Sequence, residues 1–527
     1  MPVRRPPSPS ACKLKCLGPL SAPSDQLSAI SRQRSARSEP RISNLDPRVT
    51  VLKAHRRAVG FFALAAIYVV VAYVLPRPAG VTEAGWRITA IFLATIVGLM
   101  IRPLPGAVLV LVGLMMFVLI GRLPMNEALS GFATGSVWLV LAAMMMSRAL
   151  RDTGLARRVA LLFVRRFGTS SLGVSYSLVM TDVTLATGIP SITARSGSIV
   201  LPITRSIAEL YDSKPGATAG RLGRFLMASL YQGSAVACAM FLTGQASNVL
   251  AVGLAQQYAK ITVSWSSWLF AGLAPGIASC MAVPYVVYRM VTPDIRHTPG
   301  AAAYARDELD RMGPLGRRER TTLAVFAGVI ALWMTSQWHQ RVIGVPLDVT
   351  LVAFLGLAVL LAADVMTWSD ALGEKNAWDV FVWYGGLLTM GDVLNRTGST
   401  AALAGWVGSW FAGWTWMPIL LATIVVYFYA HYAFASITAH MLSMFPPFVV
   451  MLIGAGTPPA LAVYALACMA NLTAGLTHYG TTTAPIVFAE GYVSQLDWWR
   501  VGLVVSIVNI AIWTTIGFAW WKVLGFW

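Results

Sequence analysis

Small hydroxyl-bearing residues precede a basic residue twice in the chain, each time inside an apolar stretch. The first motif is SITAR at 191–195 and the second is SITAH at 436–440. Hydroxyl groups and the backbone N–H groups at a helix N-terminus can bind an anion, whereas free carbonyl groups can hold a cation. Gly and Pro residues crowd around the first motif, and Pro202 is matched by Pro447 in the second. Both motifs therefore predict a broken helix.

The candidate ligands for an anion are hydroxyl, guanidinium and imidazole groups in these motifs and in one later segment. They are Ser191, Thr193, Arg195, Ser436, Thr438, His440 and His478. Arg195 has two interpretations: it binds a substrate carboxylate through charge-assisted hydrogen bonds, or it snorkels or pairs with Asp182. The histidines, with His431, either bind a carboxylate, couple transport to pH, or serve as satisfied polar groups of the interior.

A second interruption follows each motif, in FLTGQASNVLAV (241–252) and in NLTAGLTHYGTTTAPI (471–486). Unwound segments offer carbonyl and side-chain oxygens, which suit hard cations such as sodium. The candidate cation ligands are Gly244, Asn248, Gly480, Thr481 and Thr482. Neither the histidines nor the five cysteines have the spacing of a metal site, so we expect no cofactor beyond sodium ions.

The composition is that of an integral membrane protein. Of 527 residues, 57% are hydrophobic and only 12% are charged, about half the charged fraction of soluble domains. A spanning helix needs about 20 apolar residues. We therefore predict an all-α polytopic membrane protein with about eleven crossings and two re-entrant hairpins, at 171–202 and 418–450.

The net charge of +18 does not indicate a nucleic-acid partner, because of where it lies. Residues 1–58 form a basic, Ser/Pro/Arg-rich tail, predicted to be disordered, and other basic residues fill 151–167, 203–224 and 289–320. Basic loops mark the cytoplasmic side, so we predict a cytoplasmic N-terminus. The tail has no apolar core of a secretory signal. Its Arg/Ser-rich character leaves an organelle address, such as the plastid inner envelope, as an alternative to a cell inner membrane.

The two halves of the chain repeat each other. SVWLVLAAMMMSRALRDTGLA (136–156) aligns with FVWYGGLLTMGDVLNRTGSTA (381–401), and Ser191 and Ser436 are again 245 positions apart. In the predicted topology the repeats are inverted, which is typical of a secondary transporter with its site near the midplane. The predicted divisions are scaffold helices at 59–134 and 321–379, transport elements at 135–290 and 380–527, and a cytoplasmic linker at 291–320.

These motifs, together with the TGQASN loop at 243–248, resemble the divalent-anion/sodium symporter family over roughly residues 55–527. The resemblance is to its bacterial citrate/tartrate/succinate antiporter branch and to the plastid 2-oxoglutarate/malate translocators. It implies transport of di- or tricarboxylates by exchange or with sodium, a homodimer and an elevator mechanism. The family's Ser-Asn-Thr tips place Ile192 and Ile437 at the asparagine positions, so any role of that amide is lost, and Asn248 matches a cation-site position.

Several functions remain open at this stage. We predict a carrier of succinate-, malate-, tartrate- or citrate-like anions that works by exchange. The alternatives are a sodium-coupled carboxylate symporter, a carrier of another oxyanion such as sulfate, and an anion channel. An enzyme is disfavoured because the sequence has no nucleophile–base pair, HExxH motif or phosphate-binding loop.

Overall fold

The computed structural model describes residues 47–345, 347–409 and 413–527. These residues form helices and no strand, so the predicted all-α class is confirmed for the described chain. The chain divides into two units, residues 1–58 and residues 59–527. The predicted tail lies mostly outside the described residues, but its last part is helical from Pro47 onward.

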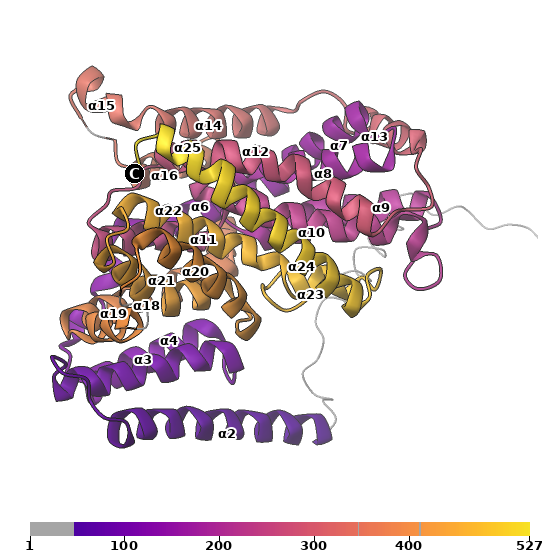
Figure 1. Cartoon of the computed structure of the whole chain (residues 1–527). Helices are drawn as coiled ribbons and strands as arrows, with labels where there is room; N and C mark the ends of the chain where they lie inside the picture. The colour runs from indigo at the N-terminus through magenta and orange to yellow at the C-terminus, as the bar shows by residue number, and fades with distance from the viewer. Residues whose placement is uncertain (1–46, 346, 410–412) are drawn as a thin grey trace, which may run out of the picture. The chain divides into compact units, whose positions relative to one another are not determined.

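The first half of the chain runs from α2 to α12 (Figure 1). In order, its elements are α2 (Pro47–Val69), η2 (Val70–Val74), α3 (Glu83–Ile101), α4 (Gly106–Leu119), α5 (Met125–Ala128), η3 (Ser130–Ala133), α6 (Gly135–Asp152), α7 (Leu155–Phe167), α8 (Ser171–Ala186), η4 (Thr193–Val200), α9 (Leu201–Leu210), η5 (Ala219–Arg221), α10 (Gly223–Met240), η6 (Leu242–Gly244), α11 (Ala246–Leu254), η7 (Ala255–Ala259) and α12 (Trp265–Met290).

The second half runs from α13 to the C-terminus. In order, its elements are α13 (Pro299–Met312), α14 (Arg317–Met334), α15 (Ser336–Ile343), α16 (Val349–Ala362), α17 (Trp368–Leu372), α18 (Lys375–Arg396), α19 (Ser399–Ser409), α20 (Trp416–Ala430), η8 (His431–Ala433), α21 (Ile437–Gly454), α22 (Pro459–Leu472), η9 (Thr473–Gly475), α23 (Ala484–Ala489), α24 (Gln495–Ile512), η10 (Trp513–Gly517) and α25 (Phe518–Val523).

The order and spacing of helices recur between the halves. α8 and α20 begin 245 residues apart, and α4 and α16 begin 243 residues apart. Each half has a helix (α6 or α18), a connector helix (α7 or α19), a helical hairpin and then a helix that breaks (α10 or α22). The repeated sequence therefore corresponds to repeated secondary structure.

Six helical segments in the described chain are long and apolar enough to cross a membrane. They are Arg57–Val74, Glu83–Ile101, Trp265–Met290, Trp416–Ala433, Ile437–Gly454 and Gln495–Val523. Three shorter apolar helices of the described chain also coincide with predicted crossings: Gly106–Leu119, Val349–Ala362 and Pro459–Gly475.

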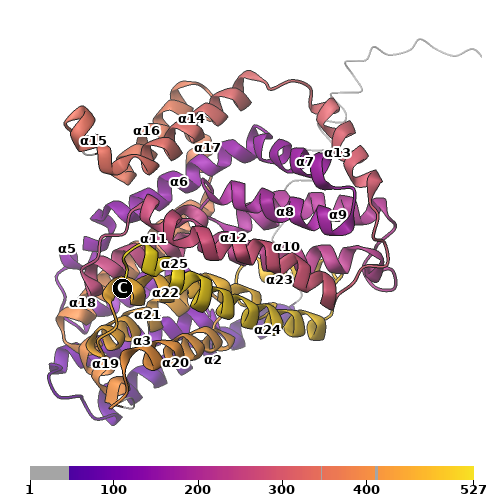
Figure 2. The ribbon, with the colours of Figure 1, turned by 45° about the horizontal axis from the view of Figure 1, so that its top comes forward.

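The centre of the second unit is formed by α10 and α22, which pack against each other. Every residue of α10 except Arg224 is buried, and so is every residue of α22 from Leu461 to Leu472. α8 and α12 lie side by side with α10 (Figure 2). A helix that is apolar all round is typical of a position surrounded by other helices, and these two helices carry the breaks described below.

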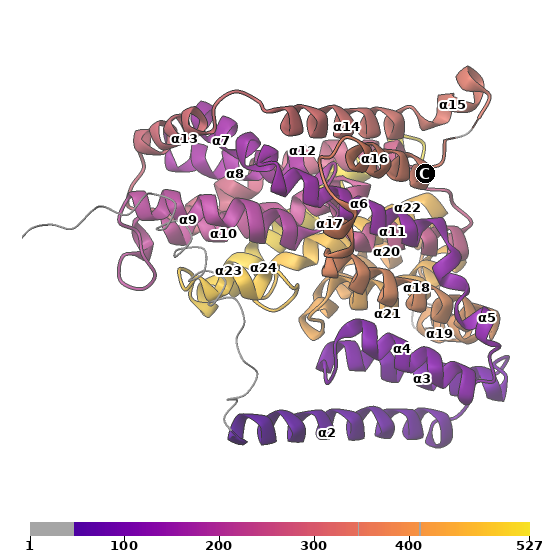
Figure 3. The same ribbon diagram turned by 180° about the vertical axis from the view of Figure 1, so that it is seen from behind.

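Arginines of α6 and α7 join the first half to the second. Arg148 lies 3.1 Å from Asp370 of α17, and Arg151 pairs with Glu374 just before α18. Arg158 donates two hydrogen bonds to the carboxylate of Glu319, one of them 2.8 Å long, at the start of α14. α6 also packs along α16 and α18 of the second half (Figure 3).

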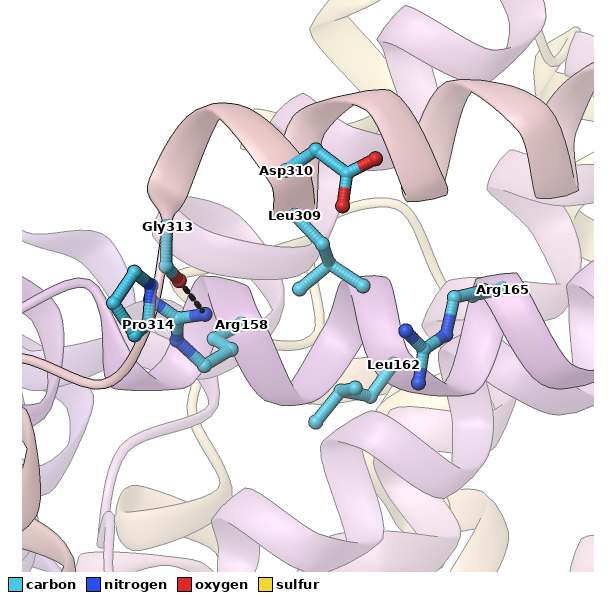
Figure 4. A pocket seen from close by; sticks show the side chains of 7 residues that line it. All are labelled: Arg158, Leu162, Arg165, Leu309, Asp310, Gly313 and Pro314. Atoms are coloured by element: carbon cyan, nitrogen blue, oxygen red, sulfur yellow. Dashed lines mark hydrogen bonds between the residues drawn. The ribbon is translucent and has the colours of Figure 1, made fainter.

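A cavity of about 410 Å³ lies between α7 and α13 (Figure 4). It is lined by Arg158, Leu162, Arg165, Leu309, Asp310, Gly313 and Pro314. Arg158 donates to the Gly313 carbonyl at 2.9 Å as well as to Glu319, so this guanidinium holds the end of α13 and the start of α14 together. The cavity lies among the connector helices and contains none of the predicted site residues.

The Arg158–Glu319 pair gives a testable contribution to stability. Its hydrogen bonds lower the pKa of Glu319 below the ordinary value. A lowered pKa in the folded state stabilises the fold above the unfolded pKa, about 4.3 for Glu, and this contribution disappears as the pH falls through the folded pKa. We expect Glu319→Gln to lower the free energy of unfolding by about 1–2 kcal/mol at neutral pH, because Arg158 loses its counter-charge.

Thermal denaturation in detergent micelles would measure this effect. Glu83→Gln is the matched control, since Glu83 pairs with Arg87 at an exposed site and its loss should cost less than about 1 kcal/mol. The difference between the wild type and Glu319→Gln should shrink in acid. Equal losses of stability in Glu319→Gln and Glu83→Gln at neutral pH would contradict a stabilising role for the Arg158–Glu319 pair.

Candidate functional site

The first hairpin has α8 as one leg and η4 with α9 as the other. Residues 187–192, called tip 1, join them. The Ser191 hydroxyl accepts a hydrogen bond from the Ala194 N–H at 3.2 Å, and the Ser191 carbonyl accepts from the Arg195 N–H at 3.1 Å. Ser191 is therefore the N-terminal cap of the second leg, which leaves its hydroxyl proton free to face a ligand.

The second hairpin has α20 and α21 as its legs, joined by residues 431–436, called tip 2. The Ser436 hydroxyl accepts from the Ala439 N–H at 3.4 Å, and its carbonyl accepts from the His440 N–H at 3.1 Å. The same two bonds thus occur at both tips, 245 residues apart. Each motif begins a helix with a serine cap at its N-terminus, where partial positive charge favours an anion.

The break between α10 and α11, residues 241–245, lies against tip 1. It is called break 1. The Thr243 hydroxyl donates to the Thr187 carbonyl at 2.7 Å, and the Ile192 N–H donates to the Gln245 side-chain oxygen at 3.2 Å. Side chains of the break therefore satisfy backbone groups of the tip, as buried polar groups in an apolar medium require.

The break between η9 and α23, residues 476–483, contacts tip 2 and the first residue of η4, the helix that follows tip 1. It is called break 2. The Thr193 hydroxyl lies 2.9 Å from the Thr482 hydroxyl and 2.8 Å from that of Thr483. On the other side, the His431 Nε2 lies 3.0 Å from the Gly480 carbonyl oxygen. Break 2 thus brings the two tips, which are far apart in sequence, to one region.

Arg195 is fully buried and pairs within its own hairpin. Its Nε lies 3.0 Å from the Asp182 carboxylate. Its Nη1 donates to the carbonyls of Ile189 and Gly244, both at 2.6 Å. The sequence left open whether Arg195 binds a substrate carboxylate or pairs with Asp182, and in the structure it pairs with Asp182. The guanidinium also ties tip 1 to break 1.

The candidate cation ligands already have partners in the protein. The Gly244 carbonyl accepts from Arg195, and the Gly480 carbonyl faces the His431 Nε2. The Asn248 amide donates to the carbonyls of Cys238 and Phe241, while its oxygen accepts from Asn471 at 2.7 Å. The Thr481 hydroxyl is hydrogen-bonded to the Tyr231 hydroxyl at 2.6 Å, and the Thr482 hydroxyl is hydrogen-bonded to that of Thr193. At break 1 the Gly244 carbonyl already contacts the guanidinium of Arg195, so this candidate ligand lies next to a fixed positive charge.

The remaining candidate anion ligands differ in how far they are buried. Thr438 is half-buried in the first turn of α21, two residues before the fully buried His440. His440 contacts His431 through their Nδ1 atoms at 3.1 Å. His478 is half-buried at break 2, where its Nδ1 accepts from the Trp499 indole at 3.1 Å.

Several residues of this region were not among the predicted ligands. Gln232 of α10 donates to the Gly475 carbonyl at 2.9 Å, and Asn471 of α22 donates to Asn248. Tyr231 and Gln245 contact break 2 and tip 1, respectively. The sequence feature that could have identified Gln232 and Asn471 is an amide side chain inside an otherwise apolar span. Such side chains are rare there unless they satisfy another polar group. Ile192 and Ile437, at the expected asparagine positions, are buried.

Paired hairpins and broken helices at the centre of a membrane protein are typical of secondary transporters. The model of the sodium:sulfate symporter transmembrane region matches residues 55–527 of this chain. The protein therefore belongs to that family, as its motifs indicated.

Several relatives align with most of this chain. The chain is 39% identical to the putative malate transporter YflS of Bacillus subtilis, covering 86% of this chain and 94% of the relative. It is 40% identical to the chloroplastic dicarboxylate transporter 1 of Arabidopsis thaliana, and the alignment covers 86% of this chain and 81% of the relative. It is 30% identical to the L-tartrate/succinate antiporter of Escherichia coli, covering 88% and 98%.

Solved structures with a similar fold are more distant in sequence. The Neisseria gonorrhoeae MtrF structure has a TM-score of 0.53 at 14% identity and covers 86% of this chain and 96% of its own. The Alcanivorax borkumensis YdaH transporter has a TM-score of 0.51 at 14% identity, and the superposition covers 76% of this chain and 88% of the transporter. These likenesses support a membrane-transporter fold.

The buried Arg195–Asp182 pair gives a prediction about its role. Arg195→Met and Asp182→Leu should each destabilise the protein by about 3–5 kcal/mol, because each leaves one buried charge unpaired. The double variant should recover most of that loss. Melting temperatures from size-exclusion chromatography after heating would compare all four proteins.

Two outcomes separate a structural role from a ligand role. A double variant no more stable than either single variant would contradict the pairing as the main role of Arg195. A stable double variant that no longer binds a dicarboxylate would show that the charge also serves the substrate.

Proposed function

We propose that the protein is a secondary active transporter of small di- or tricarboxylate anions of the succinate, malate, tartrate and citrate class, and that it works by exchange. The observation that carries the proposal is the pair of serine-capped helix N-termini at tips 1 and 2, which break 2 connects. Relatives at 30–40% identity that are named for malate, dicarboxylates and L-tartrate/succinate support this substrate class.

Two carboxylates at the ends of a short carbon chain match two helix N-termini. At each tip the serine hydroxyl already accepts a backbone bond, so its proton is available to a carboxylate oxygen. Thr193 and Thr438, each two residues after the serine, add a hydroxyl in the first turn of each helix. The partial positive charge of each N-terminus then favours one carboxylate. A monocarboxylate would use only one tip.

Exchange is preferred over sodium coupling because the candidate cation ligands have other partners. The Gly244 carbonyl, at the first predicted cation position, accepts from the fixed positive charge of Arg195. The family description favours sodium coupling as the second candidate function. Sulfate or another oxyanion stays an alternative cargo, since hydroxyl groups and helix ends bind any oxyanion.

The proposal includes an arrangement in the membrane. The two repeats are inverted with about eleven crossings of about 20 apolar residues each, and the hairpins enter from opposite faces. The N-terminus is cytoplasmic, in a bacterial inner membrane or, as an alternative, a plastid inner envelope. The protein works as a homodimer whose interface is on the scaffold helices, and the transport elements move as an elevator. The basic loops and the repeat of helices support this arrangement.

Counterflow into proteoliposomes tests the function. Uptake of labelled succinate is compared with and without unlabelled dicarboxylate inside, and with and without an inward sodium gradient. We expect internal dicarboxylate to stimulate uptake and sodium to have no effect. Stimulation by sodium alone would replace exchange with symport. No stimulation by succinate, malate, tartrate or citrate would overturn the substrate class. Uptake that does not saturate would favour a channel.

The serine caps provide a sharper prediction. Ser191→Ala and Ser436→Ala should each raise the half-saturating dicarboxylate concentration by about 10- to 100-fold, since a hydrogen bond to a charged group is lost. Loss of the cap alone costs about 1 kcal/mol of stability, whereas glycine at a cap costs only a few tenths.

Glycine substitutions separate the two roles of each serine. Ser191→Gly and Ser436→Gly keep most of the cap stability but lack the hydroxyl. If binding weakens as much in the glycine as in the alanine variants, the hydroxyl contacts the substrate. Normal half-saturation in all four variants would remove both serines from the site.

A further inference from the structure

The cavity between α7 and α13 contains two charged side chains that have no partner in the protein. Its volume of about 410 Å³ is within the range of small-ligand sites. Arg165 of α7 and Asp310 of α13 both line it, and both residues are exposed. Among the residues that the structure describes, no ion pair or side-chain hydrogen bond includes either of these two groups. They are called the two unpaired charges.

The neighbouring charges on the same two helices are paired. Arg157 lies 2.5 Å from Glu308, and Arg311 lies 2.6 Å from the same carboxylate. Arg158, the other guanidinium in the cavity, donates two hydrogen bonds to Glu319. The fold itself neutralises these groups, so the two unpaired charges are the ones that the cavity offers to a ligand.

The two unpaired charges belong to opposite walls of the cavity. Figure 4 shows Arg158 at one end, beside Gly313, and Arg165 at the other end, with its guanidinium turned toward Leu162. Asp310 is on α13, the facing helix. The guanidinium and the carboxylate are too far apart to form an ion pair, so a ligand that carries both a negative and a positive group can contact both walls at once.

The surface of α7 beside the cavity is partly apolar. Leu162, which lines the cavity, is 41% exposed, and Phe167, at the end of the helix, is 38% exposed. The guanidinium of Arg166 lies 5.2 Å from the centre of the Phe167 ring. Exposed apolar side chains next to arginines are typical of a helix at a membrane surface, where the charged groups stay among the headgroups. The proposed topology also places α7 at the cytoplasmic surface.

A phospholipid headgroup that carries an ammonium group matches this arrangement. A guanidinium binds a phosphate through charge-assisted hydrogen bonds, and an ammonium group has three N–H donors for a carboxylate. Phosphatidylethanolamine carries both groups. In phosphatidylcholine the nitrogen is fully methylated and has no N–H. Phosphatidylglycerol has no positive group, so its net negative charge is repelled by the carboxylate.

We propose that the cavity between α7 and α13 binds the headgroup of a phosphatidylethanolamine molecule from the cytoplasmic leaflet. Its phosphate contacts Arg165, its ammonium group contacts Asp310, and its acyl chains lie against Leu162 and Phe167. α7 joins α6 to the first hairpin, so the lipid holds the connector to which that hairpin is attached. The site is separate from the proposed transport site and depends only on the cytoplasmic placement of α7.

A comparison of three lipids tests the proposal. Full-length protein, purified in detergent and stripped of lipid, is titrated with phosphatidylethanolamine, phosphatidylcholine or phosphatidylglycerol of identical acyl chains. Native mass spectrometry counts the lipids bound to each chain. We expect one phosphatidylethanolamine molecule to bind about 10- to 100-fold more tightly than either other lipid, because only its ammonium group forms a charge-assisted hydrogen bond with the carboxylate. Phosphoethanolamine, the water-soluble headgroup, should bind more weakly than the lipid because it lacks the acyl chains.

Two substitutions should change the lipid preference in different ways. Arg165→Gln removes the group that binds the phosphate, so it should weaken binding of the first phosphatidylethanolamine by about 10- to 100-fold. Asp310→Asn removes both the partner of the ammonium group and the repulsion of an anionic headgroup. It should weaken binding of phosphatidylethanolamine, leave phosphatidylcholine unchanged and strengthen phosphatidylglycerol.

Arg166→Gln and Asp307→Asn are the matched controls. Each replaces an exposed charge on the same helix as one test residue, but neither residue lines the cavity. Both controls should keep the wild-type lipid preference. Because all four residues are exposed, we expect all four variants to melt in detergent at the wild-type temperature.

The other outcomes would each contradict part of the proposal. Equal binding of the three lipids, or a preference that persists in both test variants, would overturn the site. A wild-type preference for phosphatidylglycerol that Arg165→Gln abolishes would overturn the ammonium contact. Phosphoethanolamine that binds as tightly as the lipid would replace the lipid with a soluble ligand. A normal lipid preference together with failed counterflow would overturn the proposed function alone.

Discussion

Unpaired backbone groups cannot be left inside a membrane, and the structure around both hairpin tips follows from that constraint. Two helices stop within the buried centre, at 241–245 and at 476–483. Their free carbonyls and amides are satisfied by side chains of other elements: Arg195 and Gln232 donate to Gly244 and Gly475, respectively. Buried polar side chains of neighbouring elements thus let the chain break there.

Charge in this region is arranged differently in the two halves. In the first, a permanent cation is paired with Asp182 and fixed between tip 1 and break 1. In the second, the equivalent position holds a histidine that contacts a second histidine. The same backbone position therefore carries a charged guanidinium in the first half and an imidazole in the second.

The sequence was sufficient to locate both hairpins and both breaks, because Gly, Pro and Thr clusters inside apolar stretches leave few other interpretations. It also named Asp182 as a partner of Arg195, since both lie in one hairpin. It did not predict that Arg195 reaches Gly244, 49 residues away, or that Asn471 binds Asn248 across the halves. Those contacts depend on how helices pack, which periodicity does not encode.

The contacts between α10, α11 and α22 have a consequence for how such a chain can arise. Asn471 of the second half binds Asn248 of the first, and Gln232 of the first half binds the Gly475 carbonyl of the second. A single half would lose the partners of the Asn248 side-chain oxygen, the Gln232 amide and the Gly475 carbonyl. An ancestral half-length chain would therefore have needed a second copy from the start, inserted in the orientation that brings the breaks together. Gene duplication and fusion would then have made permanent an assembly that chemistry already required.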